Sequence, residues 1–221
     1  IAGETLESVR SLAAAAESAG ADFLVLQPPI GQRPGSAELL EFYSSVMTGI
    51  SHEVGIQNAP EFLGVGLSPG EVMDLRERHP HFTMMKGEGP VVQVKPFIDT
   101  LGGTMSVFNG RGGLELPDNI LAGCAGMIPA PDCADIQMRM FDALAAGDLE
   151  TAGSLYAFAL PYMVFSMQSL DVAILYGKRM FARRAGIRND CTCRVPALRP
   201  SPFLDAAMDR WSADFGPYRR C

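Results

Sequence analysis

The chain has 221 residues, 48% of them hydrophobic, which is enough for a globular domain with a substantial core. Its formal net charge of −7 argues against a nucleic-acid-binding surface. The opening Ile1-Ala2-Gly3 lacks a basic segment followed by an apolar one, and the five cysteines are an odd number. We therefore expect reduced thiols and a cytoplasmic location.

The first part of the chain alternates helix and strand patterns. Helical spacing of apolar residues predicts a helix from Glu4 to Ala19, and the apolar run Phe23 to Leu26 predicts a buried parallel strand. A second helix is expected from Ser36, and a second strand from Val54 to Gln57. Ser68-Pro69-Gly70-Glu71 combines an N-cap serine, an early proline and a glutamate three residues on, so it predicts a helix start.

The alternation continues through the middle of the chain. Phe82 to Lys86 is predicted to be a strand, Val91 to Leu101 a helix, and Thr104 to Phe108 the next strand. A short helix from Leu116 to Ala122 precedes a strand from Cys124 to Ile128. Helices are expected to fill the remainder of the chain.

Three helical segments follow the last predicted strand. They are Asp132 to Ala146, a long pair from Leu149 to Ala185 bent near Pro161, and Pro202 to Phe215. The apolar stretch from Leu155 to Tyr176 is interrupted by polar residues well short of the ~18 apolar residues that a membrane span needs. We expect a buried helix there and no membrane partner.

Strict alternation of short apolar strands with helices predicts a parallel α/β fold, either a barrel or a doubly wound sheet. No GxGxxG motif follows a strand and opens a helix, which disfavours the nucleotide-binding version. In both architectures the loops after the strands carry the chemistry.

Lys86 is the main candidate for a catalytic residue. It closes an otherwise apolar strand, where an ammonium group resists desolvation. Burial favours the neutral amine, which is a nucleophile toward a carbonyl. The alternative is a lysine at a strand end that reaches water or pairs with Glu88. Lys95 and Lys178 lie in predicted helices, where a solvated position is expected.

A metal site is not expected. Cys191-Thr192-Cys193 is an isolated CxC without a second ligand pair at zinc spacing. The three histidines, His52, His79 and His81, precede strands and so fall on the side opposite the functional loops.

Several motifs in sequence order resemble the dihydrodipicolinate synthase/N-acetylneuraminate lyase family, from Ile1 to about Ile187. The family's corresponding motifs read AGAD, TPYY, YNVPGRTG, LSP and GADGVIS, and its Schiff-base lysine ends the sixth barrel strand. The matching segments here are Ala19-Gly20-Ala21-Asp22, Pro28-Pro29, Asn58-Ala59-Pro60, Leu67-Ser68-Pro69, Phe82 to Lys86 and Gly123 to Ile128.

The resemblance implies a (β/α)8 TIM barrel represented by roughly strands 4–8, in residues 1–147, followed by a C-terminal helical domain in residues 148–221. It implies that the family's first three strands are missing from this chain. It also implies a homo-oligomer, a dimer or tetramer, and no cofactor besides the covalent imine between lysine and substrate.

The resemblance also assigns roles to site residues. Lys86 would form the Schiff base, and the backbone of Ile128 would contact the substrate. We further expect Gln57 to bind a substrate hydroxyl, and Gly110 and Arg111, in the loop after the fourth strand of this chain, to contact the substrate. Glu88 is a candidate proton carrier; the alternative for Glu88 and Arg111 is a solvated or paired surface charge.

Two positions depart from dihydrodipicolinate synthase itself. Gln57 stands where that enzyme has a proton-relaying tyrosine, and Phe62 stands where it has a carboxylate-binding arginine. Gln57-Asn58-Ala59-Pro60 and Lys86-Gly87-Glu88 are more similar to QDAP and KIE in the 2-keto-3-deoxy sugar acid dehydratase branch. We expect a lyase acting on a small 2-keto acid. The alternatives are dihydrodipicolinate synthase proper and a keto-acid-binding barrel without turnover.

Overall fold

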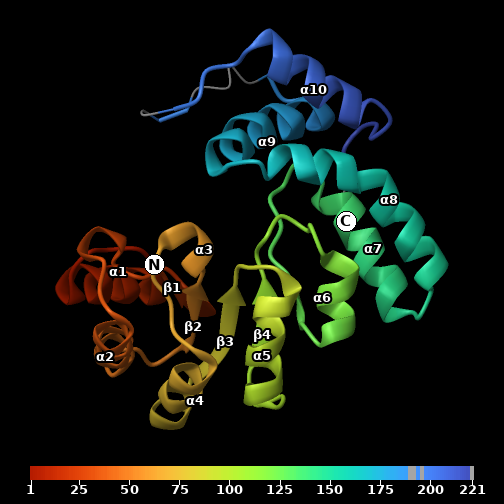
Figure 1. Cartoon of the computed structure of the whole chain (residues 1–221). Coiled ribbons are helices and arrows are strands. Elements are labelled where there is room, and N and C mark those ends of the chain that lie inside the picture. The colour runs from red at the N-terminus through yellow and green to blue at the C-terminus, as the bar shows by residue number, and fades with distance from the viewer. Residues whose placement is uncertain (189–192, 195–196, 220–221) are drawn as a thin grey trace. The chain divides into compact units, whose positions relative to one another are not determined.

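The computed structural model describes residues 1–188, 193–194 and 197–219 (Figure 1). These residues form two compact units. The first contains residues 1–110 and 121–127, and the second contains residues 111–120 and those from 128 on. The boundary at residue 147 between barrel and helical domain remains a prediction.

A five-stranded parallel sheet forms the centre of the first unit, with its strands in sequence order (Figure 1). The strands are β1 (Phe23–Leu26), β2 (Glu53–Asn58), β3 (Phe82–Gly87), β4 (Ser106–Asn109) and β5 (Gly126–Met127). All five predicted strands are present. The last is shorter than the apolar run Cys124 to Ile128, because only Gly126 and Met127 align with β4.

Helices connect the strands of this unit. They are α1 (Leu6–Ser18), α2 (Ser36–Met47), α3 (Pro60–Leu63), α4 (Pro69–Arg78) and α5 (Val91–Leu101), with a 3₁₀ turn, η1 (Ile30–Gln32), after β1. The predicted start of α4 is confirmed: Ser68 Oγ accepts from Glu71 N at 3.4 Å, and Ser68 N donates to Glu71 Oε2 at 2.7 Å. Helices α2, α4 and α5 pack one after another along the sheet (Figure 1).

Burial explains why the strand sequences are so apolar. Leu26, Val54, Ile56, Phe82 and Met85 are all fully buried. Helices therefore cover one face of the sheet completely, as expected for parallel strands joined by crossover helices.

The outer edge of β1 carries backbone hydrogen bonds from the first residue of the chain. Gln27 N donates to Ile1 O at 2.8 Å, and the Ile1 amino group donates to Val25 O at 2.6 Å. The segment before α1 thus continues the sheet at this edge, as a preceding barrel strand would. Five parallel strands do not close a barrel by themselves.

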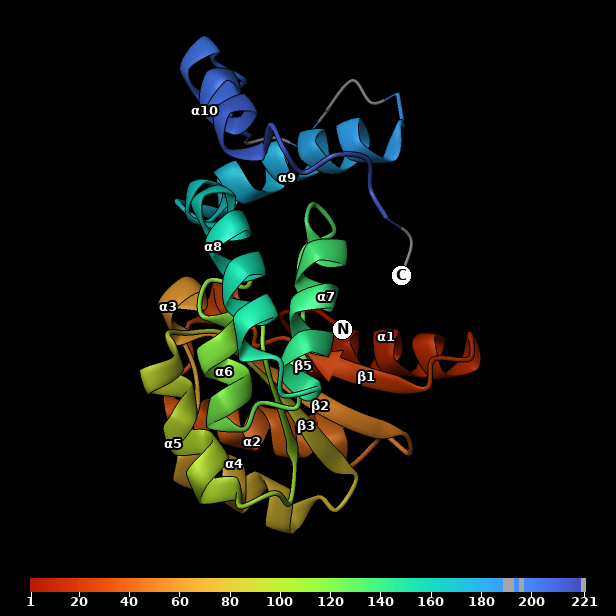
Figure 2. The same cartoon turned by 90° about the vertical axis from the view of Figure 1, so that its right-hand side faces the viewer.

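The second unit is helical. Its helices are α7 (Ala134–Ala145), α8 (Leu149–Ser166), α9 (Leu170–Ala185) and α10 (Pro202–Ser212), and most of α6 (Leu116–Ala122) also belongs to it. Helices α7 and α8 run alongside each other (Figure 2). Helix α8 continues through Pro161, near which the predicted pair was expected to bend, so the two helices do not divide at that proline. The break follows Ser166, and Ser169 then caps α9 by accepting from Val172 N at 3.2 Å.

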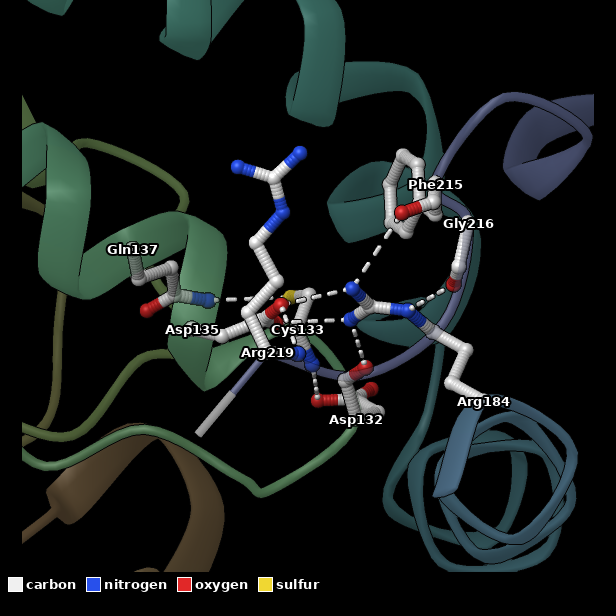
Figure 3. A network of polar contacts seen from close by, with 8 residues as sticks. All are labelled: Asp132, Cys133, Asp135, Gln137, Arg184, Phe215, Gly216 and Arg219. Atoms are coloured by element: carbon white, nitrogen blue, oxygen red, sulfur yellow. Dashed lines mark hydrogen bonds and ion pairs between the residues drawn. The ribbon is translucent and has the colours of Figure 1, made fainter. Parts of the chain in front are cut away.

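A buried ion pair ties α7 to α9 inside this unit (Figure 3). Arg184 donates to both carboxylate oxygens of Asp135 at 2.7 Å, and each side chain is only 3% exposed. Arg184 also donates to the carbonyls of Asp132 and Gly216 at 2.9 and 3.0 Å. Because every charged atom of the pair has partners, the network holds the C-terminal segment against α7. Among the described helices, none is both long and apolar enough to cross a membrane.

Candidate active site

Lys86 is the second-to-last residue of β3 and aligns with Gln57 of β2 on one side and Phe108 of β4 on the other. Neighbouring side chains along a strand point to opposite faces. A Cβ atom at Gly87 would lie 3.4 Å from Met85 Cε and 3.6 Å from Val94 Cγ2 of α5, so Met85 and Gly87 face the helices. Lys86 therefore lies on the other face of the sheet, away from the helices.

Glu88 joins the side chains of Lys86 and Gln57. Its Oε1 atom forms an ion pair with Lys86 Nζ, and its Oε2 atom accepts from Gln57 Nε2 at 3.0 Å. The side chains of Lys86 and Glu88 are 23% and 10% exposed. The pairing fits both a structural lysine and a nucleophile whose proton can pass to an adjacent carboxylate.

Gly110 leaves room for this cluster. A Cβ atom at Gly110 would lie 2.4 Å from Glu88 Oε1 and 2.5 Å from Lys86 Cε. The Gly110 amide also donates to Gly87 O at 3.1 Å, which fixes the loop after β4 against the end of β3. Any larger residue at this position would displace Lys86 or Glu88.

Two buried asparagines hold the loops around the cluster, and the sequence reasoning missed both. Asn58, at the end of β2, donates to Leu67 O at 3.0 Å and accepts from Leu67 N at 2.8 Å. Asn109, at the end of β4, donates to Gly89 O at 2.9 Å. An asparagine directly after an apolar strand is the sequence signal that would have indicated them.

Tyr43 of α2 contacts the backbone of β2 and is only 1% exposed. Its hydroxyl donates to Gln57 O at 3.4 Å, and burial strongly raises the pKa of this phenol. Tyr43 therefore stays protonated and holds the backbone of β2 at Gln57.

Four of the six predicted site residues, Lys86, Gln57, Glu88 and Gly110, thus come together in the first unit. Arg111 and Ile128 belong to the second unit. There Arg111 Nη1 pairs with Glu115 Oε1 at 2.5 Å, and Ile128 is 39% exposed directly after β5. Their contact with substrate remains a prediction.

No group of three metal-ligating side chains occurs among the described residues. Of the CxC segment, Cys193 Sγ lies 3.9 Å from Lys178 Nζ, while Cys191 and Thr192 lie outside the described part of the chain.

A model of the dihydrodipicolinate synthetase family matches residues 2–201. The chain belongs to this family. Proteins named 4-hydroxy-tetrahydrodipicolinate synthase are similar in sequence: that of Archaeoglobus fulgidus is 27% identical over 66% of this chain and 50% of its own length, and that of Methanopyrus kandleri is 29% identical over 73% and 55%. The chain thus spans about half the length of the curated relatives it matches.

Solved structures of the family have the same fold. The chain superposes on the dihydrodipicolinate synthase of Aquifex aeolicus with a TM-score of 0.84 at 19% identity, covering 97% of this chain and 72% of that one. It superposes on YagE, an E. coli K12 prophage protein of the family crystallised with pyruvate, with a TM-score of 0.85 at 20% identity, covering 96% and 72%. The predicted fold, part of a (β/α)8 barrel with C-terminal helices, is confirmed.

Proposed function

We propose that the protein containing this chain is a Schiff-base-forming lyase that acts on a 2-keto acid, with Lys86 as the nucleophile. The observation that carries the proposal is the position of Lys86: it ends a buried strand, faces away from the helical layer and contacts a carboxylate that can take its proton. Family membership supports the same chemistry.

In the proposed reaction, Lys86 Nζ passes a proton to Glu88 and attacks the C2 carbonyl of the substrate. Glu88 returns that proton to the hydroxyl of the resulting carbinolamine, water leaves, and the protonated imine that forms draws electrons from the bonds at C3. Either a C3 proton leaves or the C3–C4 bond breaks, and an enamine forms. Glu88 is the proposed proton carrier, because its carboxylate can accept a proton and contacts Lys86.

Gln57 is proposed to select the substrate. Its amide does not titrate, so it cannot relay protons as a tyrosine would. Its Nε2 atom already donates to Glu88, which leaves the amide oxygen to accept from a substrate hydroxyl. We therefore propose a 2-keto acid with a neutral, hydroxylated tail, such as a 2-keto-3-deoxy sugar acid, undergoing aldol cleavage or dehydration.

Dihydrodipicolinate synthase activity is the second candidate, because the similar sequences carry that enzyme's name. It would condense pyruvate with aspartate semialdehyde. Gln57 and Phe62 argue against it, since an amide and a phenyl ring supply neither a relayed proton nor a cation for the semialdehyde carboxylate. A barrel that binds keto acids without turnover is the third candidate, and the Lys86–Glu88 pair argues against it.

The test uses the full-length protein. Borohydride reduction in the presence of pyruvate should give a stable covalent adduct, and release of pyruvate or dehydration product from 2-keto-3-deoxy sugar acids should exceed condensation with aspartate semialdehyde. An absent adduct would favour the binding protein, and robust semialdehyde condensation would favour the second candidate. A cytoplasmic homo-oligomer remains part of the proposal.

A further inference from the structure

We propose that Gln27, the residue directly after β1, is a specificity-determining residue that binds a hydroxyl of the substrate tail beyond the one that Gln57 binds. This inference rests on the proposed function, and it extends the site by one strand. All the residues that carry it lie in the first unit.

The register of β1 against β2 places Gln27 beside Gln57. Leu26 aligns with Ile56 and the two strands are parallel, so the residues that follow, Gln27 and Gln57, are neighbours across the sheet. Gln27 N donates to Ile1 O at 2.8 Å, so the backbone still hydrogen-bonds as a strand would at this residue. Neighbouring strands lie about 4.8 Å apart, and we expect a similar spacing between the two glutamines.

The side chain of Gln27 points to the same face of the sheet as Lys86. Leu24 and Leu26 are 3% and 0% exposed, whereas Phe23 is 53% exposed, so the helices cover the face that carries the two leucines. Side chains alternate along a strand, which places Gln27 on the face opposite Leu26. Gln27 is half-buried there.

Gln57 lies between Gln27 and the proposed nucleophile. It aligns with Lys86 of β3, and its Nε2 atom donates to Glu88 Oε2 at 3.0 Å. Three polar side chains therefore follow one another across three neighbouring strands at the same level of the sheet. From β3 to β1 they are the amine of Lys86, the amide of Gln57 and the amide of Gln27.

The opposite side of Lys86 is apolar. Phe108 of β4 aligns with Lys86, and a Cβ atom at Gly126 of β5 would lie 3.2 Å from Phe108 Cε1. The ring therefore lies against the last strand, where the glycine leaves room for it. A phenyl ring offers no partner to a hydroxyl, and burying an unpaired hydroxyl costs free energy.

The level below the polar row is also apolar. A Cβ atom at Gly55 would lie 2.4 Å from Met84 Cγ, so Met84 fills the space beside β2. A hydroxylated tail attached to Lys86 thus finds hydrogen-bonding partners towards β2 and β1, first Gln57 and then Gln27. The Gln27 amide can donate and accept, which suits a hydroxyl. Pyruvate ends at C3 and would not reach it.

The test is Gln27→Met in the full-length protein, which removes the amide and keeps the length of the side chain. We expect kcat/KM for a six-carbon 2-keto-3-deoxy sugar acid to fall roughly three- to tenfold, the range of one hydrogen bond. For a 2-keto acid with a hydroxyl at C4 only, kcat/KM should change less than twofold, and the borohydride adduct with pyruvate should form at the wild-type rate. Gln27→Leu should give the same pattern. Gln93→Met, at an exposed glutamine of α5, is the matched control and should change nothing.

A comparison with Gln57→Ala separates the two amides. That variant should lower kcat/KM for both acids, because both carry the C4 hydroxyl, whereas Gln27→Met should affect only the longer one. Equal losses on the two acids in Gln27→Met, or an unchanged kcat/KM for the six-carbon acid, would overturn the inference while leaving the proposed function intact. Failure of the wild-type protein to trap pyruvate would overturn the proposed function and this inference with it.

Discussion

Lys86 and Glu88 form an ion pair at the carboxyl end of β3, with both side chains largely shielded from solvent. The pair brings the Lys86 amino group and the Glu88 carboxylate into direct contact on the face of the sheet away from the helices. Under the proposed function, the Glu88 carboxylate takes the proton of Lys86 before the amine attacks the substrate.

Glu88→Gln tests the proposed proton transfer from Lys86. The variant keeps the shape of the side chain but cannot take a proton, so the borohydride adduct with pyruvate should form more slowly and kcat should fall roughly 10²- to 10⁴-fold. Glu53→Gln, at the opposite end of β2, is the matched control and should leave both unchanged. Wild-type kcat in Glu88→Gln would remove Glu88 from the mechanism.

Gly110→Ala tests the packing of the loop over Lys86. The added methyl group would meet Lys86 Cε at 2.5 Å and Glu88 Oε1 at 2.4 Å, so the amine must shift. We expect the rate of adduct formation to fall roughly tenfold and the free energy of unfolding to drop by about 1–3 kcal/mol. Gly70→Ala, where a Cβ atom meets nothing within 4 Å, should affect neither. An unaltered adduct rate in Gly110→Ala would show that Lys86 is not confined by this loop.

The fold was largely predictable from the sequence because buried strands and helix starts each have a characteristic residue pattern. Runs such as Phe23 to Leu26 contain only apolar residues, and capping residues such as Ser68 mark helix starts by local hydrogen bonding. The length of β5 was not predictable, because it depends on which residues of β4 lie in register to pair with it. The proline in α8 also gave no local signal that the helix would continue past it.

The position of Lys86 was predictable because a lysine at the end of an apolar strand is unusual, and the structure places it there beside Glu88. Its catalytic role stays a prediction. The bond between Gln57 and Glu88 was not predictable, because it depends on the register of β2 against β3 and on the path of the chain after β3.

Gln57→Ala should weaken recognition of the substrate hydroxyl. In the wild-type protein, kcat/KM for a hydroxylated 2-keto acid should exceed that for its deoxy analogue. We expect this ratio to fall roughly tenfold in the variant, because the hydroxyl loses its partner. Steady-state kinetics with the two substrates measure it, and an unchanged ratio would exclude Gln57 from substrate selection. Condensation with aspartate semialdehyde should be negligible in both proteins.

Asp135→Asn tests the buried ion pair with Arg184 (Figure 3). The variant leaves a buried guanidinium without its counter-charge, so we expect the free energy of unfolding at pH 7 to fall by about 3–5 kcal/mol. Asp209→Asn removes the partner of Arg183 in an exposed pair and should cost less than about 1 kcal/mol. Urea denaturation compares the two, and equal costs would contradict the assigned role of the buried pair.

The same pair predicts a pH dependence. Burial alone would raise the pKa of Asp135, but hydrogen bonds from Arg184 and the Arg219 amide, together with the Arg184 charge, outweigh burial and lower it. A carboxyl with a lowered pKa stabilises the fold above its unfolded pKa of about 4, and the stabilisation is lost as pH falls through the folded value. The difference between wild type and Asp135→Asn should therefore shrink below about pH 4; a constant difference down to pH 3 would contradict the direction of this shift.

The central claim, that Lys86 forms the imine, is tested most directly by locating the adduct. The full-length protein is reduced with borohydride in the presence of pyruvate, digested and mapped by mass spectrometry. We predict a single modified peptide with the adduct on Lys86, and no adduct in Lys86→Ala or Lys86→Arg, since arginine stays protonated and forms no imine. Lys95→Ala, which removes an exposed lysine paired with Asp99, should be labelled like the wild type. An adduct on Lys95 or Lys178, or continued labelling of Lys86→Ala, would contradict the claim.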